Sequence, residues 1–192
     1  MRLEPWVQQF AGRRRLILAA LALPFCRSAA GQDGVATPVR TVPNGSGAGA
    51  YAGLRRWGSG SFRRFGFLIY DATLWAGDDP QRPPLALRLD YHRSLEGKAI
   101  ASASVNEMVR LFGERGVPSA WGEAMRRVFP DVRAGDHLVG VHRDGAAHFY
   151  QGERLLGVID APGFAPAFFA IWLDARTSAP DLRQALLARK EA

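Results

Sequence analysis

An arginine pair beside a run of aromatic residues is the part of the sequence best suited to bind a ligand. Arg63 and Arg64 follow a glycine pair, Gly58 and Gly60, and precede the apolar run FGFLIYDATLW. A guanidinium group at the edge of an apolar cleft can hold a carboxylate or a phenolate. The two arginines also suit a simpler role, as edge-strand charges that keep sheets from pairing with one another. The residue types leave both roles open.

The stretch that carries these arginines, Trp57 to Trp75, is typical of strand structure, because aromatic and β-branched residues favour a pleated, half-buried surface. Its glycines can adopt positive φ or admit a second backbone, which predicts a turn or bulge. In an unbroken strand, alternate residues share one side. That side would carry Arg63, Phe65, Phe67, Ile69, Asp71, Thr73 and Trp75. A tight turn at Gly66 would instead divide the stretch into a hairpin and change which residues share a face.

Other residue types that do chemistry are not arranged for it. Of the four histidines, His142 and His148 fall on opposite faces of a predicted hairpin, and His137 lies about 13 Å along the strand from His148. Cys26 is the single cysteine, and no His-x-x-x-His pair occurs. No serine stands in a Gly-x-Ser-x-Gly motif, and the Gly-Ser-Gly run opens a strand and not a helix. We therefore expect no metal site and no cofactor.

The amino-terminal segment has the three parts of a secretory signal peptide. Residues 13–15 are basic, residues 16–25 are apolar, and Ser-Ala-Ala at 28–30 is a small-residue cleavage site. The apolar run is shorter than the roughly 20 residues that span a bilayer. We expect cleavage near Ala30, no membrane span in the mature chain, and a periplasmic location. The paired arginines leave the export route open between general secretion and the twin-arginine pathway.

Charge and composition predict one mature domain of about 160 residues without a disulfide, since Cys26 leaves with the signal peptide. The net charge of the 192-residue chain is +7, and the signal peptide accounts for about four of these charges. No block of lysine and arginine follows it, so we expect no nucleic-acid partner. The predicted organisation is a signal peptide at 1–30, a flexible segment at 31–53 and a folded domain at 54–192.

Hydrophobic periodicity along this domain predicts an α+β fold with a mostly antiparallel sheet. Strands come first, a helix pair follows, then further strands and two final helices. Beyond 57–75, strands are expected near 39–42 and at 85–91, 136–142, 147–150 and 154–159, and helices at 96–112, 120–129 (with Ser119 as N-cap), 163–173 and 181–189. Asp144-Gly145 is expected to form the two-residue turn between the strands 136–142 and 147–150.

Four segments of the domain resemble the bacterial chalcone isomerase-like proteins, which carry a secretion signal. The segments are GSGSFRRFGFLIYDATLW, LALRLDYHRSLEGKAIASASVNEMVR, FPDVRAGDHLVGVH and GERLLGVIDAPGFAPAFFAIWLDARTSAPDLRQALL. They occur in the family's order and cover nearly all of 54–187. The resemblance implies the chalcone isomerase fold, a large antiparallel β-sheet with a layer of helices on one face and a cleft between. The family includes enzymes that close a flavanone ring as well as fatty-acid-binding proteins, so the fold does not decide the function.

The resemblance also implies where a ligand would bind. In the enzymes and fatty-acid binders, an arginine just after a Gly-x-Gly turn meets the phenolate or carboxylate, and a threonine and tyrosines assist. Here that arginine position falls on Phe62 without a gap and on Arg63 with a one-residue shift. Thr73 is the candidate threonine, whereas Trp75 and a position near Lys98 stand where relatives have tyrosines. The candidate ligand-binding residues are Arg63, Phe65, Phe67, Thr73, Trp75 and Lys98.

We therefore expect an exported, non-catalytic protein that binds a small apolar, anionic ligand such as a fatty acid. Two alternatives stay open. The first is an intramolecular lyase or isomerase of the chalcone isomerase type that acts on a phenolic enone, with catalytic residues unassigned. The missing tyrosine hydroxyls count against it, because they would hold the water that polarises the substrate ketone. The second is a non-catalytic accessory partner of an envelope system.

Overall fold

The computed structural model of this chain describes residues 39–40 and 47–188. The predicted signal peptide, its cleavage site and most of the segment 31–53 lie outside the described residues. Within the described part, no helix is both long and apolar enough to cross a membrane.

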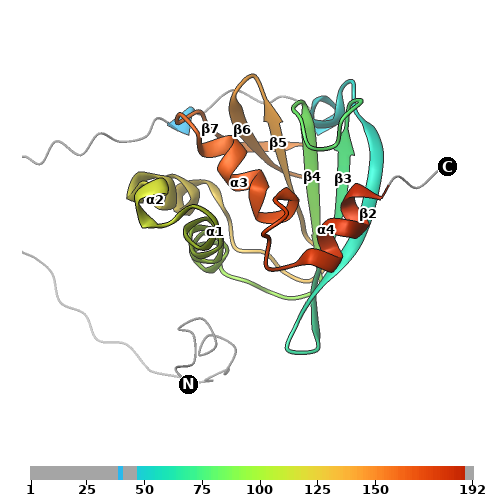
Figure 1. Cartoon of the computed structure of the whole chain (residues 1–192), viewed down its shortest axis with the longest axis horizontal. Helices are drawn as coiled ribbons and strands as arrows, with labels where there is room; N and C mark the ends of the chain where they lie inside the picture. Colours follow the sequence, from blue (N-terminus) through green and yellow to red (C-terminus); the bar gives the residue numbers. More distant parts are fainter. Residues whose placement is uncertain (1–38, 41–46, 189–192) are drawn as a thin grey trace, which may run out of the picture. The chain divides into compact units, whose positions relative to one another are not determined.

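Seven antiparallel strands form one sheet (Figure 1). In spatial order the strands run β1-β7-β6-β5-β4-β3-β2, and every neighbouring pair is antiparallel. The strands are β1 (Val39–Arg40), β2 (Arg55–Arg64), β3 (Phe67–Ala76), β4 (Leu85–Tyr91), β5 (His137–Arg143), β6 (Ala146–Gln151) and β7 (Arg154–Ile159). The predicted antiparallel α+β architecture is thereby confirmed.

The four α-helices pack on one face of this sheet, as Figure 1 shows. They are α1 (Gly97–Phe112), α2 (Ser119–Val128), α3 (Phe164–Leu173) and α4 (Pro180–Leu187). Two short 3₁₀ helices accompany them, η2 (Gly47–Tyr51) and η3 (Glu114–Gly116). Each α-helix lies within two residues of its predicted bounds. The predicted N-cap of α2 is wrong, because Ser119 is the first helical residue and Pro118 precedes it without a side-chain cap.

The stretch 57–75 is a hairpin and not an unbroken strand. Phe65 and Gly66 form its two-residue turn, and both have positive φ, at 49° and 80°. Positive φ at both positions matches the twist of the flanking strands. Asp144 and Gly145 form the predicted second turn in the same way, at 52° and 76°. The register after that turn, with His142 opposite Ala147, is also as predicted.

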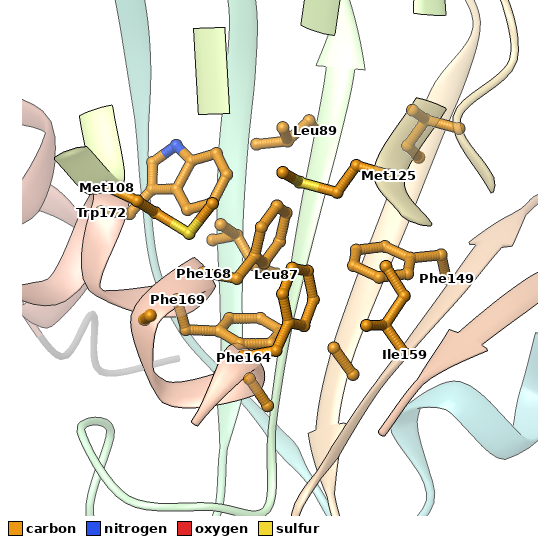
Figure 2. Packing of buried hydrophobic residues seen from close by; sticks show 14 of the residues in the cluster. Leu87, Leu89, Met108, Met125, Phe149, Ile159, Phe164, Phe168, Phe169 and Trp172 are labelled. Atoms are coloured by element: carbon orange, nitrogen blue, oxygen red, sulfur yellow. The ribbon is translucent and has the colours of Figure 1, made fainter. Parts of the chain in front are cut away.

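Aromatic rings fill the space between the sheet and the helices (Figure 2). The ring of Phe168 on α3 has its centroid 5.1 Å from that of Phe149 on β6 and 5.6 Å from that of Phe164. Met108 from α1 and Met125 from α2 are fully buried against this group. Helix α3 is apolar on nearly every side because it packs on β5 and β6 and also against α1 and α4.

The glycine pair of β2 allows helix α4 to lie directly on the sheet. A Cβ atom at Gly58 would meet the backbone oxygen of Leu186, and one at Gly60 would lie 2.7 Å from the Ala185 Cβ. The strand register shifts between Arg56 and Gly58, which is the predicted bulge. Of the two functions open to these glycines, the close approach of a second backbone is the one observed. The Trp57 indole also donates a hydrogen bond of 3.1 Å to the carbonyl of Leu187.

Candidate functional site

The six residues predicted to bind a ligand do not line one cleft. Arg63 is exposed near the end of β2, and Phe65 and Phe67 are 70% and 56% exposed beside the hairpin turn. Lys98 is exposed on α1, where its ammonium group lies 2.9 Å from the Glu96 carboxylate. The turn at Phe65 and Gly66 is the physical reason, because it ends the alternation on which the shared face was predicted.

The other two predicted residues, Thr73 and Trp75, lie on the face of the sheet that points away from the helices. Trp75 packs there in a small apolar cluster apart from the main core, and its ring centroid is 4.6 Å from that of Tyr51. Thr73 shares this face by strand alternation and stands opposite Ser59 on β2. The structure therefore does not bring the six residues together. A role of the individual residues in ligand binding stays a prediction.

Three other aromatic residues form a row on the helix-facing side of the sheet. This aromatic row consists of Phe62 on β2, Tyr70 on β3 and Tyr91 on β4. The rings of Phe62 and Tyr70 are stacked with centroids 5.0 Å apart, and Tyr91 meets Tyr70 edge-on at 5.9 Å. Phe62 is partly exposed, whereas Tyr91 is buried in the main core. The row thus leads from the surface near the hairpin into the space between sheet and helices.

Tyr70 carries a hydroxyl group within this apolar space. The Trp172 indole on α3 donates a hydrogen bond of 3.0 Å to the Tyr70 hydroxyl oxygen. Burial, with a smaller contribution from the negative charge of Glu107, raises the pKa of Tyr70 far above its usual value. The phenol therefore keeps its proton at neutral pH and can donate it in a hydrogen bond to a further acceptor.

Tyr91 is the second phenol of this space, and its protonation follows the same logic. Burial raises the pKa of Tyr91, and the neighbouring Tyr70 adds to the effect. Neither phenol acts as a base or a nucleophile at neutral pH, because both remain protonated. Tyr70 and Tyr91 therefore offer protonated hydroxyl groups, which can donate hydrogen bonds, next to apolar ring faces.

Charged residues near the ends of α1 and α3 bind one another. The Glu107 carboxylate accepts hydrogen bonds from the Arg110 guanidinium at 2.7 Å and from the Ser178 amide at 2.9 Å. Burial opposes the ionisation of Glu107, but these hydrogen bonds hold its pKa below the usual range. The Arg176 guanidinium and amide bind Asp174 and lower the pKa of that carboxyl to about 2. These pairs fasten the connection between α3 and α4 to α1.

Ser61, Asp71 and His92 form a polar group of another kind on the opposite face. Asp71 accepts hydrogen bonds from the Ser61 hydroxyl and shares one of 2.7 Å with His92. The Ser61 hydrogen bond lowers the pKa of Asp71; partial burial opposes it, and His92 and Arg63 add to it. In a serine-hydrolase triad the histidine stands between serine and carboxylate, whereas here the carboxylate does. The arrangement cannot activate the serine as a nucleophile.

A surface hollow of about 540 Å³ lies among the loops next to the Leu85 end of β4, whereas the aromatic row reaches the Tyr91 end. Loop residues line it: Ala52, Gly53, Pro83, Pro84, Arg143, Asp144 and Gly145. The Arg143 guanidinium crosses toward the Ala52 carbonyl, to which it donates a hydrogen bond of 2.6 Å. Within 39–40 and 47–188, no group of three or more histidine, cysteine or acidic residues could hold a metal ion.

Sequence reasoning did not select Tyr70 as a candidate, although strand alternation puts this residue on the side opposite Thr73 and Trp75, as the structure has it. A signal was available in the hairpin alternative, in which strand 85–91 pairs with the second strand of the hairpin. In that pairing Tyr91, the last residue of its strand, lies opposite Tyr70. Trp172 could be predicted only as core, since nothing in the sequence of α3 distinguishes it from the surrounding phenylalanines.

Comparison with known proteins supports the fold. No protein-family model matches the chain. A fatty-acid binding protein of Arabidopsis thaliana has a similar structure, with a TM-score of 0.57 over 70% of this chain and 87% of that one, at 11% sequence identity. An uncharacterized protein of Haemophilus influenzae is 27% identical over 109 residues, which are 57% of this chain. The chain spans about half (54%) of the length of that relative.

The sheet, the single helical layer and this structural likeness together define a chalcone isomerase-like α+β fold. At 11% identity the likeness extends to the fold alone, and the function has to be argued from the side chains.

Proposed function

We propose that this protein binds a small apolar acid, such as a fatty acid, between its sheet and its helices and does not catalyse a reaction. The observation that carries the proposal is the hydroxyl of Tyr70, the middle residue of the aromatic row, which accepts a hydrogen bond from the Trp172 indole. The likeness to a fatty-acid binding protein supports the same ligand class.

The ligand's polar group would bind to the Tyr70 hydroxyl. Because this oxygen accepts a hydrogen bond from Trp172, the O–H group is polarised and becomes a better donor to a ligand carboxylate. The hydrocarbon chain would lie against the ring faces of Phe62 and Tyr91, which removes apolar surface from water.

Binding in this place requires the structure to open, because side chains fill the space between sheet and helices. Helix α4 and the segment before it would have to move, which breaks contacts of that segment with α1 and of the helix with β2. They close the side of the space above β2 and β3, where the partly exposed Phe62 marks an entrance. The ligand therefore binds by replacing contacts that the empty protein makes with itself.

Lipid extraction and mass spectrometry of the purified protein, followed by calorimetric titration with palmitate, tests the proposal. We expect a co-purified fatty acid or saturable palmitate binding. Tyr70→Phe should weaken palmitate binding by about tenfold, because a hydrogen bond to a charged group is lost. Arg63→Ala is the matched comparison and shows whether the exposed arginine contributes, as the sequence predicts.

The proposal fails if no lipid is extracted and palmitate does not bind. Equal palmitate binding by the wild type and Tyr70→Phe would remove Tyr70 as the polar contact and leave Arg63 as the anchor to be judged from its own variant.

Export to the periplasm, with cleavage near Ala30, is part of the same proposal and rests on the signal-peptide pattern of residues 1–30. Expression of the full chain in a Gram-negative host, followed by fractionation and amino-terminal sequencing, tests it. A mature protein that starts close to Gly31 in the periplasmic fraction is expected. Retention of the intact amino terminus in the cytoplasm would contradict it.

A further inference from the structure

Two phenylalanine rings lie exposed at the tip of the β2–β3 hairpin. Among the described residues, three large hydrophobic side chains are exposed, namely Phe65 at 70%, Phe67 at 56% and Phe112 at 40%. The first two flank Gly66 in the hairpin turn. Figure 1 shows that this turn extends beyond the helices that cover the sheet. We call residues 63–67, together with Arg93, the hairpin tip.

The conformation of Phe65 shows that this ring is costly to place here. Its φ is 49°, a region that glycine, asparagine and aspartate adopt more readily than a bulky residue does. The corresponding position in the second hairpin is occupied by Asp144. A residue that is both unfavourable for its turn and exposed contributes little to folding stability, so its role has to be sought in what it contacts.

Arginines surround the two rings. The Arg93 guanidinium carbon lies 4.4 Å from the ring centroid of Phe67, and that of Arg64 lies 5.5 Å from the ring centroid of Phe65. Arg63, directly before Arg64 in the sequence, is also exposed. Asp71, the acidic residue that interacts with Arg63, also binds the Ser61 hydroxyl and His92. The tip therefore combines positive charge with aromatic surface, the pair of features that favours an anionic membrane interface.

We propose that the hairpin tip docks the protein onto an anionic lipid bilayer. Phe65 and Phe67 enter the headgroup region, where aromatic rings partition well, and Arg63, Arg64 and Arg93 contact the lipid phosphates. This proposal does not depend on the ligand proposed above, because vesicle binding is measured without a fatty acid.

A bilayer fits the tip better than an acidic protein does. A stable protein interface buries about 800 Å² on each partner. The hairpin tip is too small to supply this area alone. A bilayer needs no complementary shape, and a few rings with neighbouring positive charges are enough for reversible binding.

Co-sedimentation of the full chain with vesicles tests the proposal. One set of vesicles is phosphatidylcholine alone, and the other is phosphatidylcholine mixed with phosphatidylglycerol. We expect binding to the mixed vesicles that weakens as salt is added, because phosphate contacts by arginine are screened. Since residues 16–25 are apolar and can also bind lipid, the readout is the difference between variants of the same full chain.

Phe65→Asn is the sharpest variant, because asparagine suits the positive φ and should fold at least as well as the wild type. With Phe67→Ser added, binding to the mixed vesicles should fall about tenfold or more. Phe112→Ser is the matched control, since Phe112 is also exposed and also has an arginine, Arg176, against its ring.

The charge contribution is tested with a second pair of variants. Arg64→Ala with Arg93→Ala should weaken binding by about fivefold for each arginine removed. Arg115→Ala with Arg133→Ala removes the same charge from exposed positions elsewhere and should bind as the wild type does. Equal binding by the tip variants and their controls overturns the proposal. So does binding to an acidic protein without binding to either kind of vesicle.

Discussion

Tyr70 shows how one hydroxyl group can serve both stability and binding. The indole N–H group of Trp172 on α3 lies in the hydrophobic core. A buried N–H group without an acceptor lowers the free energy of unfolding. The Tyr70 oxygen supplies that acceptor across the space between β3 and α3. In the proposed binding mode the same phenol donates its proton to the ligand. A residue that fastens the helical layer to the sheet is thus also the group that a ligand would meet.

Replacing Tyr70 by phenylalanine should therefore destabilise the protein. The variant keeps the ring contacts but leaves the Trp172 N–H without its acceptor, which costs about 1–2 kcal/mol of the free energy of unfolding. Urea unfolding followed by tryptophan fluorescence measures it. Tyr150→Phe is the control, because Tyr150 lies partly buried on the opposite face, and its change should stay below about 0.5 kcal/mol. Equal effects of the two substitutions would show that the Tyr70–Trp172 contact adds little stability.

At the scale of elements, helix α4 depends on two residues of β2 that have no side chain. Gly58 and Gly60 let the backbone of α4 approach the strand directly, and the Trp57 indole holds the Leu187 carbonyl at the end of that helix. The helix packs through Leu182 and Leu186, which are both buried. Its attachment is therefore set by the strand as much as by the helix's own apolar face.

Gly58→Ala should loosen α4. The added methyl group would meet the Leu186 carbonyl oxygen, a backbone atom that cannot turn away, so the helix must shift at a cost of about 1–3 kcal/mol. Hydrogen exchange of the α4 amides and urea unfolding measure the effect. Gly77→Ala is the control, since a methyl group there meets nothing within 4 Å. Unchanged exchange of the α4 amides in Gly58→Ala would disprove the role of the glycine.

The two hairpins explain which elements could be predicted from the sequence. Asp144-Gly145 is a typical two-residue turn, and its register follows from the turn type. Phe65-Gly66 forms the same kind of turn, but phenylalanine at positive φ is uncommon, so the sequence left the hairpin as an alternative to an unbroken strand. Because side chains alternate, that turn decided whether Arg63 shares a face with Thr73 and Trp75. The predicted site residues are separated for this reason, although the fold was predicted correctly.

For the molecule as a whole, three histidines are held neutral by the fold. Burial lowers the pKa of His137, His142 and His148, and the nearby charge of Arg88 adds to the effect at His137. His142 stacks on the ring of Phe169 with centroids 5.5 Å apart. The folded protein therefore binds protons less readily than the unfolded chain does.

Stability should consequently fall as the pH drops below about 6.5, the usual pKa of histidine in an unfolded chain. In that range the unfolded chain takes up protons more readily than the folded histidines do, because burial lowers the pKa of the folded histidines, and this favours unfolding. Urea unfolding at a series of pH values from neutral to mildly acidic measures the loss. His142→Gln should reduce the slope, because one of the three contributing groups is gone. If His142→Gln leaves the pH dependence of the free energy of unfolding unchanged, that dependence comes from titratable groups other than His142.

The short strand β1 has a consequence for how the chain can be shortened. This strand pairs with β7 at one edge of the sheet. In η2, Ala50 and Tyr51 belong to the same hydrophobic cluster as Trp75 and Val139. A version that starts at residue 54, the predicted domain boundary, would lack β1 and leave β7 as an unpaired edge strand. The free backbone amide and carbonyl groups of β7 could then pair with β7 of a second copy. Light scattering should show such self-association for 54–192 and its absence for a version that starts before Val39.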